Sequence, residues 1–388
     1  MNAILFDGAQ RTSLLPLTFL MPVADLRIGI DTVKEKWEDF LGYSCSYACA
    51  DYLSASFPMK SEPENLWINA AVLPNEGLAK AVKNLNLGSS IWQGETLLAA
   101  KLAQGKDWKS ITEGEQYQAE VDILNRPSDL FRLNDKQLRA DFERLTKGKV
   151  SANLHASNQV FGDQVFLEEG AKVHGAILNA ETGPIYIAKG AEIMEGSVVR
   201  GPLAMCEQAT LKLSTKIYGA TTIGPHAKVG GEVNNSVIWG YSNKGHDGFL
   251  GNSVIGKWCN LGADTNNSNL KNNYGEVKVW SYESEAYEAS GLQFHGLIMG
   301  DHSKTGINTM LNTGTTVGVA ANIFGSGFPA KFVPCFSWGG ADGFTTFKLE
   351  KAYEVAERMM NRRGVELTEE NKKELLHVFK LSAKYRAD

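Results

Sequence analysis

The sequence has few cysteines, no long apolar run and no excess of positive charge. Five cysteines in 388 residues, of which only Cys45 and Cys49 lie close together, provide neither a disulfide framework nor a zinc-ligand set, so we expect reduced thiols. No stretch approaches the roughly 20 consecutive apolar residues of a membrane span. Asp7 falls where a secretion signal would be apolar, and we therefore expect a cytoplasmic protein.

The charge balance argues against nucleic acid as a partner. The formal net charge is -5, and 21% of the residues are charged against 43% that are hydrophobic. This is an ordinary globular composition without the positive field that attracts a polyanion. At this length the chain is expected to form more than one domain.

The middle of the sequence repeats an aliphatic residue every six positions. Neither a helix, with 3.6 residues per turn, nor an ordinary strand, with two, has this period, whereas a hexapeptide β-helix does. Each short strand then points one residue into a core that stacked coils share. The unbroken series is Ile187, Ile193, Val199, Met205, Leu211, Ile217, Ile223 and Val229.

The same spacing recurs in shifted registers, which indicates insertions. The longest insertion, between Leu261 and Leu311, is rich in Asn and aromatic residues, and predicts either loops or strands of a different kind. The segment SNKGHDGF at 242–249 is a second interruption. The shifted series are Phe161, Leu167, Val173; Phe249, Ile255, Leu261; and Leu311, Val317, Ile323.

The flanks differ from the repeat. Before it, strand-like runs (AILF, LWINAAVL, SSIWQG) alternate with a helix predicted over 31–41, whose Thr32 and Glu35 are spaced as a capping box, which indicates an α/β unit. A second helix is predicted over 135–145. After the repeat, helices are predicted near 349–363 and 368–384. We therefore expect an α/β domain at 1–148, a parallel β-helix at 149–337 and a helical tail at 338–388.

The repeat region resembles the left-handed β-helix acetyltransferase half of the bifunctional enzymes that make UDP-N-acetylglucosamine. The resemblance rests on EVNNSVIWGYSNKGHDGFLGNSVIGKWCNLGADTNNSNLK and implies the left hand and a homotrimer. The matching positions are Glu232, Gly245, His246, Leu250, Gly251, Ile255, Gly256, Asn260, Gly262, Ala263 and Asn269.

The resemblance also implies the chemistry. Acetyl transfer to an amine needs a base that takes the proton of the attacking ammonium, and His246 is the candidate, because histidine titrates near neutral pH. Acetyl-CoA is the implied donor and a sugar phosphate the acceptor. Backbone N–H groups of the following coil would stabilise the thioester oxyanion. Glu232, Asn260 and Asn269 are the implied substrate-binding residues; Gly262, Ala263 and Lys304 are assigned to the donor.

The solenoid departs from the family at two positions. The lysine that binds phosphate ahead of the catalytic loop falls on Asn234, and the tyrosine after the histidine falls on Phe249. Lys244 or Lys271 is a candidate to supply the missing charge; the alternative is that both are ordinary solvated loop lysines.

The N-terminal stretch ILFDGAQRTSLLPLTFLMPVADLRIGI is similar to the opening of sugar-1-phosphate nucleotidyltransferases. Arg11 would then pair with a phosphate of a nucleoside triphosphate, and Asp7 would hold Mg²⁺. The phosphate loop has a single glycine, Gly8, and the usual lysine after the proline is Val23. The two matches together resemble the bifunctional UDP-N-acetylglucosamine pyrophosphorylase and glucosamine-1-phosphate N-acetyltransferase family, in the variant found in Bacteroidetes.

Three functions remain open from the sequence. The preferred prediction is a sugar-phosphate acetyltransferase with His246 as base, alone or combined with nucleotidyl transfer. The second is a sugar-1-phosphate nucleotidyltransferase whose solenoid serves assembly. The third is a trimeric scaffold that binds sugar nucleotides without catalysis.

Overall fold

The chain divides into two units, described separately below. In the computed structural model, which describes residues 2–386, the first unit comprises Met1–Leu26 with Asp31–Arg126, and the second comprises Arg27–Ile30 with Pro127–Asp388. All five cysteines are free, as expected. Among the described residues, no helix has the length and apolar character that crossing a membrane requires.

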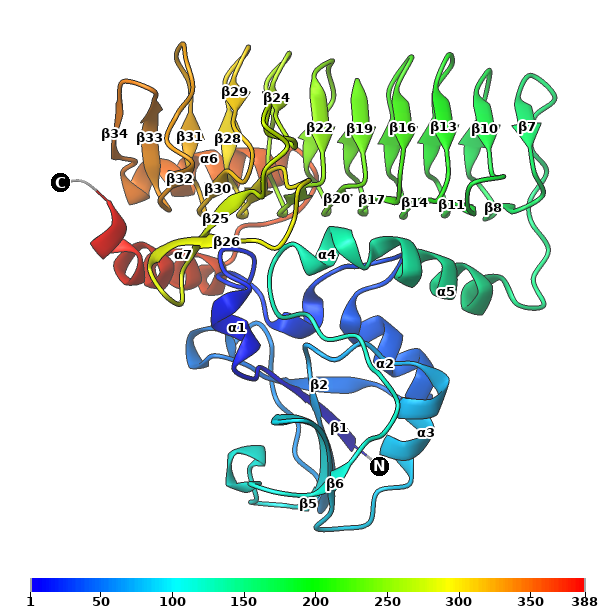
Figure 1. The fold of residues 1–388 in the computed structure, drawn as a ribbon, viewed down its shortest axis with the longest axis vertical. Helices are drawn as coiled ribbons and strands as arrows, with labels where there is room; N and C mark the ends of the chain where they lie inside the picture. The colour runs from blue at the N-terminus through cyan, green and yellow to red at the C-terminus, as the bar shows by residue number, and fades with distance from the viewer. Residues whose placement is uncertain (1, 387–388) are drawn as a thin grey trace. The chain divides into compact units, whose positions relative to one another are not determined.

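The first unit is built on a mixed sheet of six strands, in the order β2-β1-β3-β5-β4-β6 (Figure 1). Apolar runs form its centre, where β1 pairs in parallel with β2 and β3, and β5 pairs antiparallel with β3 and β4. The predicted strand-like runs are therefore confirmed. The strands are β1 (Asn2–Phe6), β2 (Cys45–Ala48), β3 (Glu64–Asn69), β4 (Ser90–Gln93), β5 (Thr96–Ala103) and β6 (Glu115–Gln116).

The helices of the first unit are α1 (Gln10–Ser13), α2 (Val33–Leu41) and α3 (Glu76–Lys83). The predicted capping box of α2 is confirmed: the Glu35 amide donates to Thr32 Oγ1 over 3.2 Å, and the Thr32 amide donates to Glu35 Oε2 over 2.6 Å. These two bonds satisfy amides that have no partner inside the helix. The helix ends at Gly42, whose φ of 85° is left-handed.

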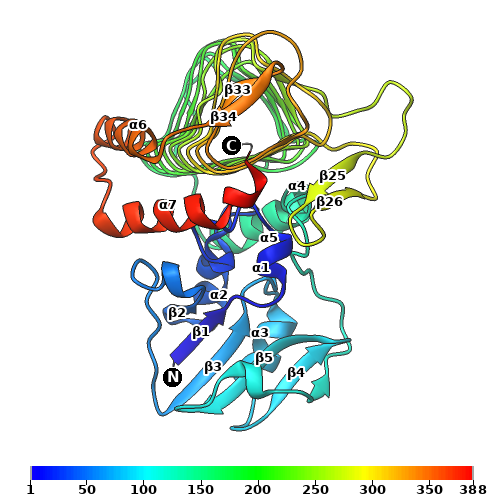
Figure 2. The same ribbon diagram turned by 90° about the vertical axis from the view of Figure 1, so that its left-hand side faces the viewer.

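The second unit contains a parallel β-solenoid whose short strands lie on three faces (Figure 2). The first face consists of β7 (Gln159–Phe161), β10 (Ile177–Asn179), β13 (Val198–Arg200), β16 (Lys216–Tyr218), β19 (Glu232–Asn234) and β22 (Phe249–Gly251). The second consists of β8 (Val165–Leu167), β11 (Ile185–Ile187), β14 (Leu203–Met205), β17 (Thr221–Ile223), β20 (Val237–Ile238), β23 (Val254–Ile255), β27 (Ile298–Met299), β30 (Thr316–Val317) and β32 (Phe332–Val333). The third begins with β9 (Lys172–Val173), β12 (Glu192–Ile193), β15 (Thr210–Leu211), β18 (Lys228–Val229) and β21 (Asn243–Lys244).

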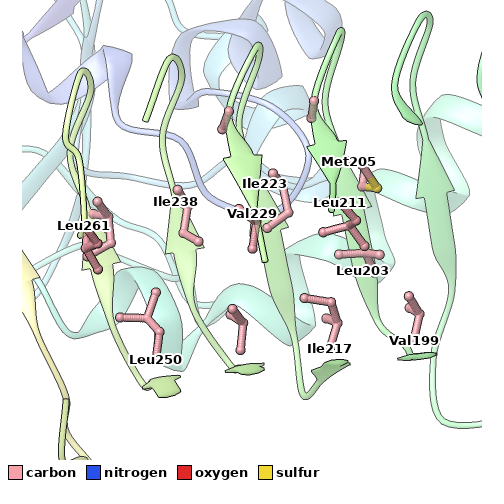
Figure 3. Packing of buried hydrophobic residues seen from close by; sticks show 14 of the residues in the cluster. Val199, Leu203, Met205, Leu211, Ile217, Ile223, Val229, Ile238, Leu250 and Leu261 are labelled. Atoms are coloured by element: carbon pink, nitrogen blue, oxygen red, sulfur yellow. The ribbon is translucent and has the colours of Figure 1, made fainter. Parts of the chain in front are cut away.

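The six-residue series lines the interior of this solenoid. Its eight members, Ile187 to Val229, fall one on each of the successive strands β11 to β18, and none is more than 1% exposed. Stacked coils bring equivalent residues together, so that Ile193 lies opposite Leu211 and Leu211 opposite Val229. Figure 3 shows this continuous apolar column. The predicted parallel β-helix is confirmed.

One register was predicted wrongly by a single residue. Val233 pairs with Leu250, which is buried, whereas Phe249 pairs with Glu232 and is partly exposed. The spacing between the buried residues Leu250 on β22 and Ile255 on β23 is five residues instead of six, so counting back by six from Ile255 reaches Phe249. A one-residue shift exchanges the inner and outer faces of a strand. Phe161, in the terminal coil, is also not a core residue, with 46% of its surface exposed.

The longest insertion contains a hairpin that differs from the coils. Its strands β25 (Lys278–Ser281) and β26 (Ala286–Ala289) pair antiparallel. The coils resume after it and end in a second antiparallel pair. The remaining strands are β24 (Asn266–Asn267), β28 (Lys304–Thr305), β29 (Met310–Leu311), β31 (Asn322–Ile323), β33 (Ser337–Gly340) and β34 (Gly343–Thr346).

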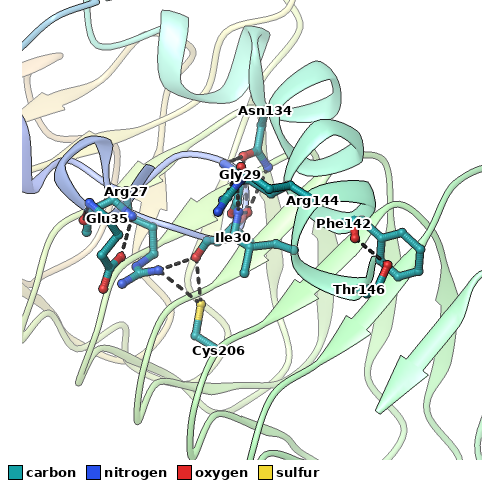
Figure 4. Close-up of polar contacts among 12 residues, drawn as sticks. Arg27, Gly29, Ile30, Glu35, Asn134, Phe142, Arg144, Thr146 and Cys206 are labelled. Atoms are coloured by element: carbon teal, nitrogen blue, oxygen red, sulfur yellow. Dashed lines mark hydrogen bonds and ion pairs between the residues drawn. The ribbon is translucent and has the colours of Figure 1, made fainter. Parts of the chain in front are cut away.

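Helices α4 (Asp129–Arg132) and α5 (Asn134–Thr146) precede the coils. Asn134 Nδ2 donates to the Ala220 carbonyl over 3.0 Å, and its Oδ1 accepts from the Gly29 amide over 2.7 Å (Figure 4). Thr222 Oγ1 in turn donates to the Gly29 carbonyl over 2.7 Å. Gly29 has a φ of +69°, and a Cβ there would lie 2.3 Å from Asp141 Oδ2. Segment 27–30 lies between α5 and the coils, and it can pass there only because residue 29 is a glycine.

The predicted C-terminal helices are α6 (Leu349–Asn361) and α7 (Glu369–Leu381). Ala352, Ala356 and Met360 are buried, so one face of α6 is apolar. A capping box between Thr368 and Asn371 begins α7.

Candidate active site

His246 lies on the loop that joins β21 to β22, at a corner of the solenoid. His246 and Asp247 are both exposed. Gly248 has a φ of +122°, and a Cβ there would lie 2.2 Å from the Thr265 carbonyl oxygen. The loop therefore needs glycine at this position to pass close to the next coil while its histidine faces solvent.

Lys244 is buried inside the solenoid, although both alternatives for it placed its ammonium in solvent. It lies opposite Val229 in the core column and is 3% exposed. Its Nζ donates to the Gly230 carbonyl over 2.9 Å and to the His246 carbonyl over 3.0 Å. Burial lowers the pKa of Lys244 to about 8. This lysine holds the His246 loop from inside the solenoid instead of reaching a ligand outside it.

The coil after His246 brings Ala263 close to the loop. The Asp264 amide donates to the Asp247 carbonyl over 3.0 Å, which ties the two coils together. Within residues 2–386, the Ala263 N–H has no hydrogen-bond acceptor, and Ala263 is partly exposed. The neighbouring amide of Gly262 instead donates to the Thr305 carbonyl over 3.1 Å. Gly262 and Ala263 are the two glycine–alanine positions predicted to bind the acyl donor. Of these, Ala263 therefore has a backbone N–H that is available to a ligand beside the His246 loop.

Gly262 serves the stacking of the coils. A Cβ at this position would lie 2.4 Å from the Gly306 carbonyl oxygen and 2.8 Å from the Ile307 amide nitrogen. Backbone atoms of the next coil cannot move away as a flexible side chain can. Donor binding by Gly262 stays a prediction. The close packing of Gly262 against the next coil does not depend on whether it binds the donor.

Glu232 lies on β19, next to β22 on the first face. Its carboxylate accepts a hydrogen bond from the Tyr218 hydroxyl over 2.5 Å. Burial, with this bond to Glu232, raises the pKa of Tyr218. Because Glu232 pairs in register with Phe249, it lies three residues from His246 across the adjacent strands.

The predicted asparagines are held by other asparagines. Asn260 Oδ1 accepts from Asn243 Nδ2 over 2.9 Å, where Asn243 immediately precedes Lys244. Asn269 Nδ2 donates to Asn252 Oδ1 over 2.8 Å, beyond the end of β22. Asn260 therefore lies on the face that leads into the His246 loop, and Asn269 lies on the other side of β22.

The other predicted lysines make local contacts. Lys271 Nζ donates to the Glu276 carbonyl over 3.0 Å. Lys304 Nζ donates to the His302 carbonyl over 2.7 Å, and desolvation lowers the pKa of Lys304 to about 8. Lys304 is in the coil after Asn260, with which it forms a bridge. Neither lysine shares a contact with His246.

In the first unit, Asp7 and Arg11 lie together in a pocket of about 540 Å³. Asp7 Oδ2 is 3.2 Å from Arg11 Nε, and Asp7 Oδ1 accepts from the Val23 amide over 2.9 Å. Burial raises the pKa of Asp7 to about 6. Arg11 also donates to the Thr18 carbonyl and the Tyr52 hydroxyl, each over 2.8 Å.

This arrangement bears on the magnesium prediction. Among residues 2–386, no three His, Cys, Asp or Glu side chains gather as a metal-binding group. As the side chains lie, the two oxygens of Asp7 face the guanidinium of Arg11 and a backbone amide, which is an environment for an ion pair. Mg²⁺ at Asp7 therefore stays a prediction.

The chain is similar to known proteins in both its N-terminal part and its solenoid. Residues 3–150 match the family model described as sugar nucleotidyl transferase. A protein named bifunctional protein GlmU from Synechococcus elongatus is 23% identical over 277 residues, which cover 68% of this chain and 54% of that one.

Two archaeal proteins are more similar over shorter stretches. Bifunctional protein GlmU from Methanocaldococcus jannaschii is 31% identical over 195 residues, 50% of this chain and 41% of its own length. A bifunctional sugar-1-phosphate nucleotidylyltransferase/acetyltransferase from Sulfurisphaera tokodaii is 31% identical over 144 residues, 37% of this chain and 35% of its own. The chain thus spans about half the length, or less, of these curated relatives.

Proposed function

The chain is related to the GlmU-like bifunctional nucleotidyltransferase/acetyltransferase family, and from this premise we propose that its solenoid is an acetyltransferase. It moves an acetyl group from acetyl-CoA to the amino group of an amino-sugar 1-phosphate, with His246 as the general base. The chain is then a transferase of sugar-nucleotide synthesis.

The observation that carries this proposal is the position of the Ala263 amide. Its N–H has no acceptor in the described chain, and its neighbour Asp264 is bonded to Asp247 in the His246 loop. A base and an uncommitted backbone donor on adjacent coils are the two groups that acyl transfer to an amine requires.

The reaction follows from these two groups. His246 takes a proton from the ammonium of the acceptor, and the free amine forms a C–N bond to the thioester carbonyl carbon. The carbonyl oxygen of the tetrahedral intermediate accepts a hydrogen bond from the Ala263 N–H. Collapse breaks the C–S bond, and the thiolate of CoA receives the proton that His246 holds. The acylated nitrogen still carries one proton too many, which it releases to solvent, so each turnover liberates one proton. The products are an N-acetylated sugar phosphate and CoA.

Product analysis tests this function. The purified full chain is incubated with acetyl-CoA and glucosamine 1-phosphate, and the acetylated sugar is sought by mass spectrometry. The proposal expects the N-acetylated product with a stoichiometric amount of CoA. If acetyl-CoA is consumed only by hydrolysis, or not at all, the proposal fails for this acceptor.

A second function is favoured by the family match over residues 3–150. We propose that the first unit joins a sugar 1-phosphate to a nucleoside triphosphate and releases pyrophosphate. The pocket lined by Asp7 and Arg11, with Trp108 on its wall, offers a cation and an aromatic face for a nucleotide. Pyrophosphate release that depends on Mg²⁺, sugar 1-phosphate and nucleoside triphosphate together is the test.

The resemblance to this family also supports a proposal about assembly and location. Three copies would form a trimer in the cytoplasm, with the acyl donor between neighbouring solenoids. Analytical ultracentrifugation of the purified chain distinguishes a trimer from a monomer.

A further inference from the structure

A pocket of about 400 Å³ lies between the third face of the solenoid and the C-terminal end of α6. Figure 2 shows α6 alongside the coil. Lys228 of β18 and Asn243 of β21 approach it from the solenoid, together with Asn260 of the next coil. Arg362 and Arg363, at the end of α6, approach from the opposite side. The pocket therefore joins parts of the sequence more than a hundred residues apart.

The positive charges of this pocket are not neutralised by the chain. Within residues 2–386, no carboxylate lies within ion-pair distance of Lys228, Arg362 or Arg363. Desolvation lowers the pKa of Lys228, and the charges of Arg363, Lys212 and Arg362 lower it further, against an opposing effect of Glu192. Like charges that line the same pocket repel one another, and a bound anion would relieve this repulsion.

The pocket also offers neutral hydrogen-bond donors. Asn243 uses one hydrogen of its amide on Asn260 Oδ1. The Nδ2 group of Asn260 has no acceptor in the described chain. The pocket therefore combines two guanidinium groups, an ammonium group and amide N–H groups. These donors suit a phosphate, and each arginine can bind two phosphate oxygens at once.

We propose that this pocket binds a phosphate group of a substrate. The family's phosphate-binding lysine is Asn234 here, and both candidates to replace it are committed elsewhere, Lys244 to two buried carbonyls and Lys271 to the Glu276 carbonyl. Within residues 2–386, the cations of the pocket have no internal ion-pair partner, and neither has Lys216, which pairs in register with Glu232 on the first face. Of these, only the cations of the pocket are gathered around a cavity next to Asn260.

The pocket and the candidate active site are adjacent. Asn260 belongs to both, and Asn243 precedes His246 by three residues, roughly 10 Å of extended chain. A substrate held by its phosphate in the pocket can therefore extend toward the His246 loop. Two substrates carry such a phosphate, the amino-sugar 1-phosphate and acetyl-CoA; naming these two rests on the proposed function, whereas the phosphate site itself does not.

Titration calorimetry on the full chain tests this site. The ligands are glucosamine 1-phosphate, CoA and inorganic pyrophosphate, each measured against wild type, Lys228→Gln and Arg363→Gln. Arg358→Gln is the matched control, because Arg358 is on the same helix with 81% of its side chain exposed and outside the pocket. We expect at least one ligand to bind wild type, to bind each pocket variant at least about tenfold more weakly, and to bind the control within about twofold.

The pattern of losses identifies the source of the phosphate. Weaker binding of glucosamine 1-phosphate alone assigns the pocket to the acceptor, and weaker binding of CoA alone assigns it to the donor. The proposal is overturned if wild type binds none of the three, or if both pocket variants bind them all as wild type does. Arg363→Lys keeps the charge but cannot bind two phosphate oxygens at once, so its affinity should lie between those of wild type and Arg363→Gln. Thermal melting confirms that each variant is folded. His246→Ala should bind phosphate normally, so a failure of the catalytic proposal leaves this test intact.

Discussion

The Nζ of Lys244 donates a hydrogen bond over 3.0 Å to the carbonyl oxygen of His246, two residues further along the chain. This bond comes from the inside of the solenoid, whereas the His246 side chain is exposed outside it. A second bond from the same ammonium, to Gly230, ties the loop to the preceding coil. Lys244 is therefore a positioning residue: it holds the backbone from which the candidate base projects.

Replacing Lys244 with Met tests this role. Met fills the core but cannot donate to the carbonyls of Gly230 and His246, so the loop loses its internal support. We expect kcat for acetyl transfer to fall by about ten- to a hundredfold, with a smaller change in KM, because small displacements of a catalytic group are costly. Steady-state kinetics on a folded variant measure this. Lys189→Met, at an exposed position, is the control, and an unchanged kcat in Lys244→Met would remove the positioning role.

The burial of Lys244 predicts a pH dependence of stability. Its pKa is about 8 in the folded protein and about 10.4 in an unfolded chain. The unfolded state therefore binds more protons between these values, and the free energy of unfolding rises with pH across that window. Relative to Lys244→Met, wild type should gain up to about 3 kcal/mol from pH 8 to 10.5. Asp247, Glu232 and Lys216 also act on this lysine.

Denaturant unfolding at pH 7.5, 8.5 and 9.5, followed by circular dichroism, measures the difference between the two proteins. The comparison cancels other groups that titrate in the same range, Lys304 among them. A difference that stays constant with pH would mean that Lys244 is not buried as a titrating cation.

Gly262 and Gly245 provide a matched pair of glycine substitutions. The Cβ of Gly262→Ala would meet the backbone of the next coil at 2.4 Å, whereas that of Gly245→Ala meets only the side chain of Asn243 at 3.0 Å. We expect Gly262→Ala to cost about 1–3 kcal/mol, as overpacking does, and Gly245→Ala to cost less than about 1. Urea denaturation compares them; equal costs would contradict the close stacking at Gly262.

The solenoid core predicts a second stability difference. Ile223 is fully buried in the aliphatic column, whereas Leu213 is 62% exposed. Ile223→Ala leaves a cavity that the coils on either side cannot close, so it should cost about 2–5 kcal/mol. Leu213→Ala should change stability by less than about 0.5 kcal/mol. Thermal and denaturant melts of both variants test this, and similar values would contradict the assignment of the core.

The regular parts of the fold could be predicted from the sequence because their causes are local. The six-residue spacing from Ile187 to Val229 reflects one inward residue on each strand. This spacing can be recognised in the sequence without knowing which distant residues are in contact. The capping box between Thr32 and Glu35 likewise depends on residues three positions apart. Both are present as predicted.

The environment of Lys244 was predictable in part but was missed. Counting six residues from Ile238 reaches Lys244, and six more reach Leu250, both of which are buried. The pattern thus contained the signal. Because lysine is seldom buried, a lysine at this position favours a solvated loop when the sequence is considered alone.

The phosphate pocket could not be predicted from local pattern. Lys228 and Arg362 meet only because α6 lies against the third face of the solenoid, and nothing in their spacing encodes that contact. In the sequence, Arg362 and Arg363 ahead of Gly364 are typical of a helix end, so the local pattern gives no sign of a ligand. The hydrogen bonds of Arg11 also depend on tertiary structure. The same is true of the Ala263 amide, which has no acceptor in the described chain.

The most direct measurement of the central claim is the rate of CoA release from acetyl-CoA and glucosamine 1-phosphate, compared between wild type, His246→Ala and His155→Ala. His155 is an exposed histidine that precedes the first coil strand, so its replacement controls for loss of a surface imidazole. The account predicts turnover by wild type and His155→Ala, and a rate reduced at least a hundredfold in His246→Ala, as expected for loss of a general base. Turnover by His246→Ala at the rate of wild type would contradict it.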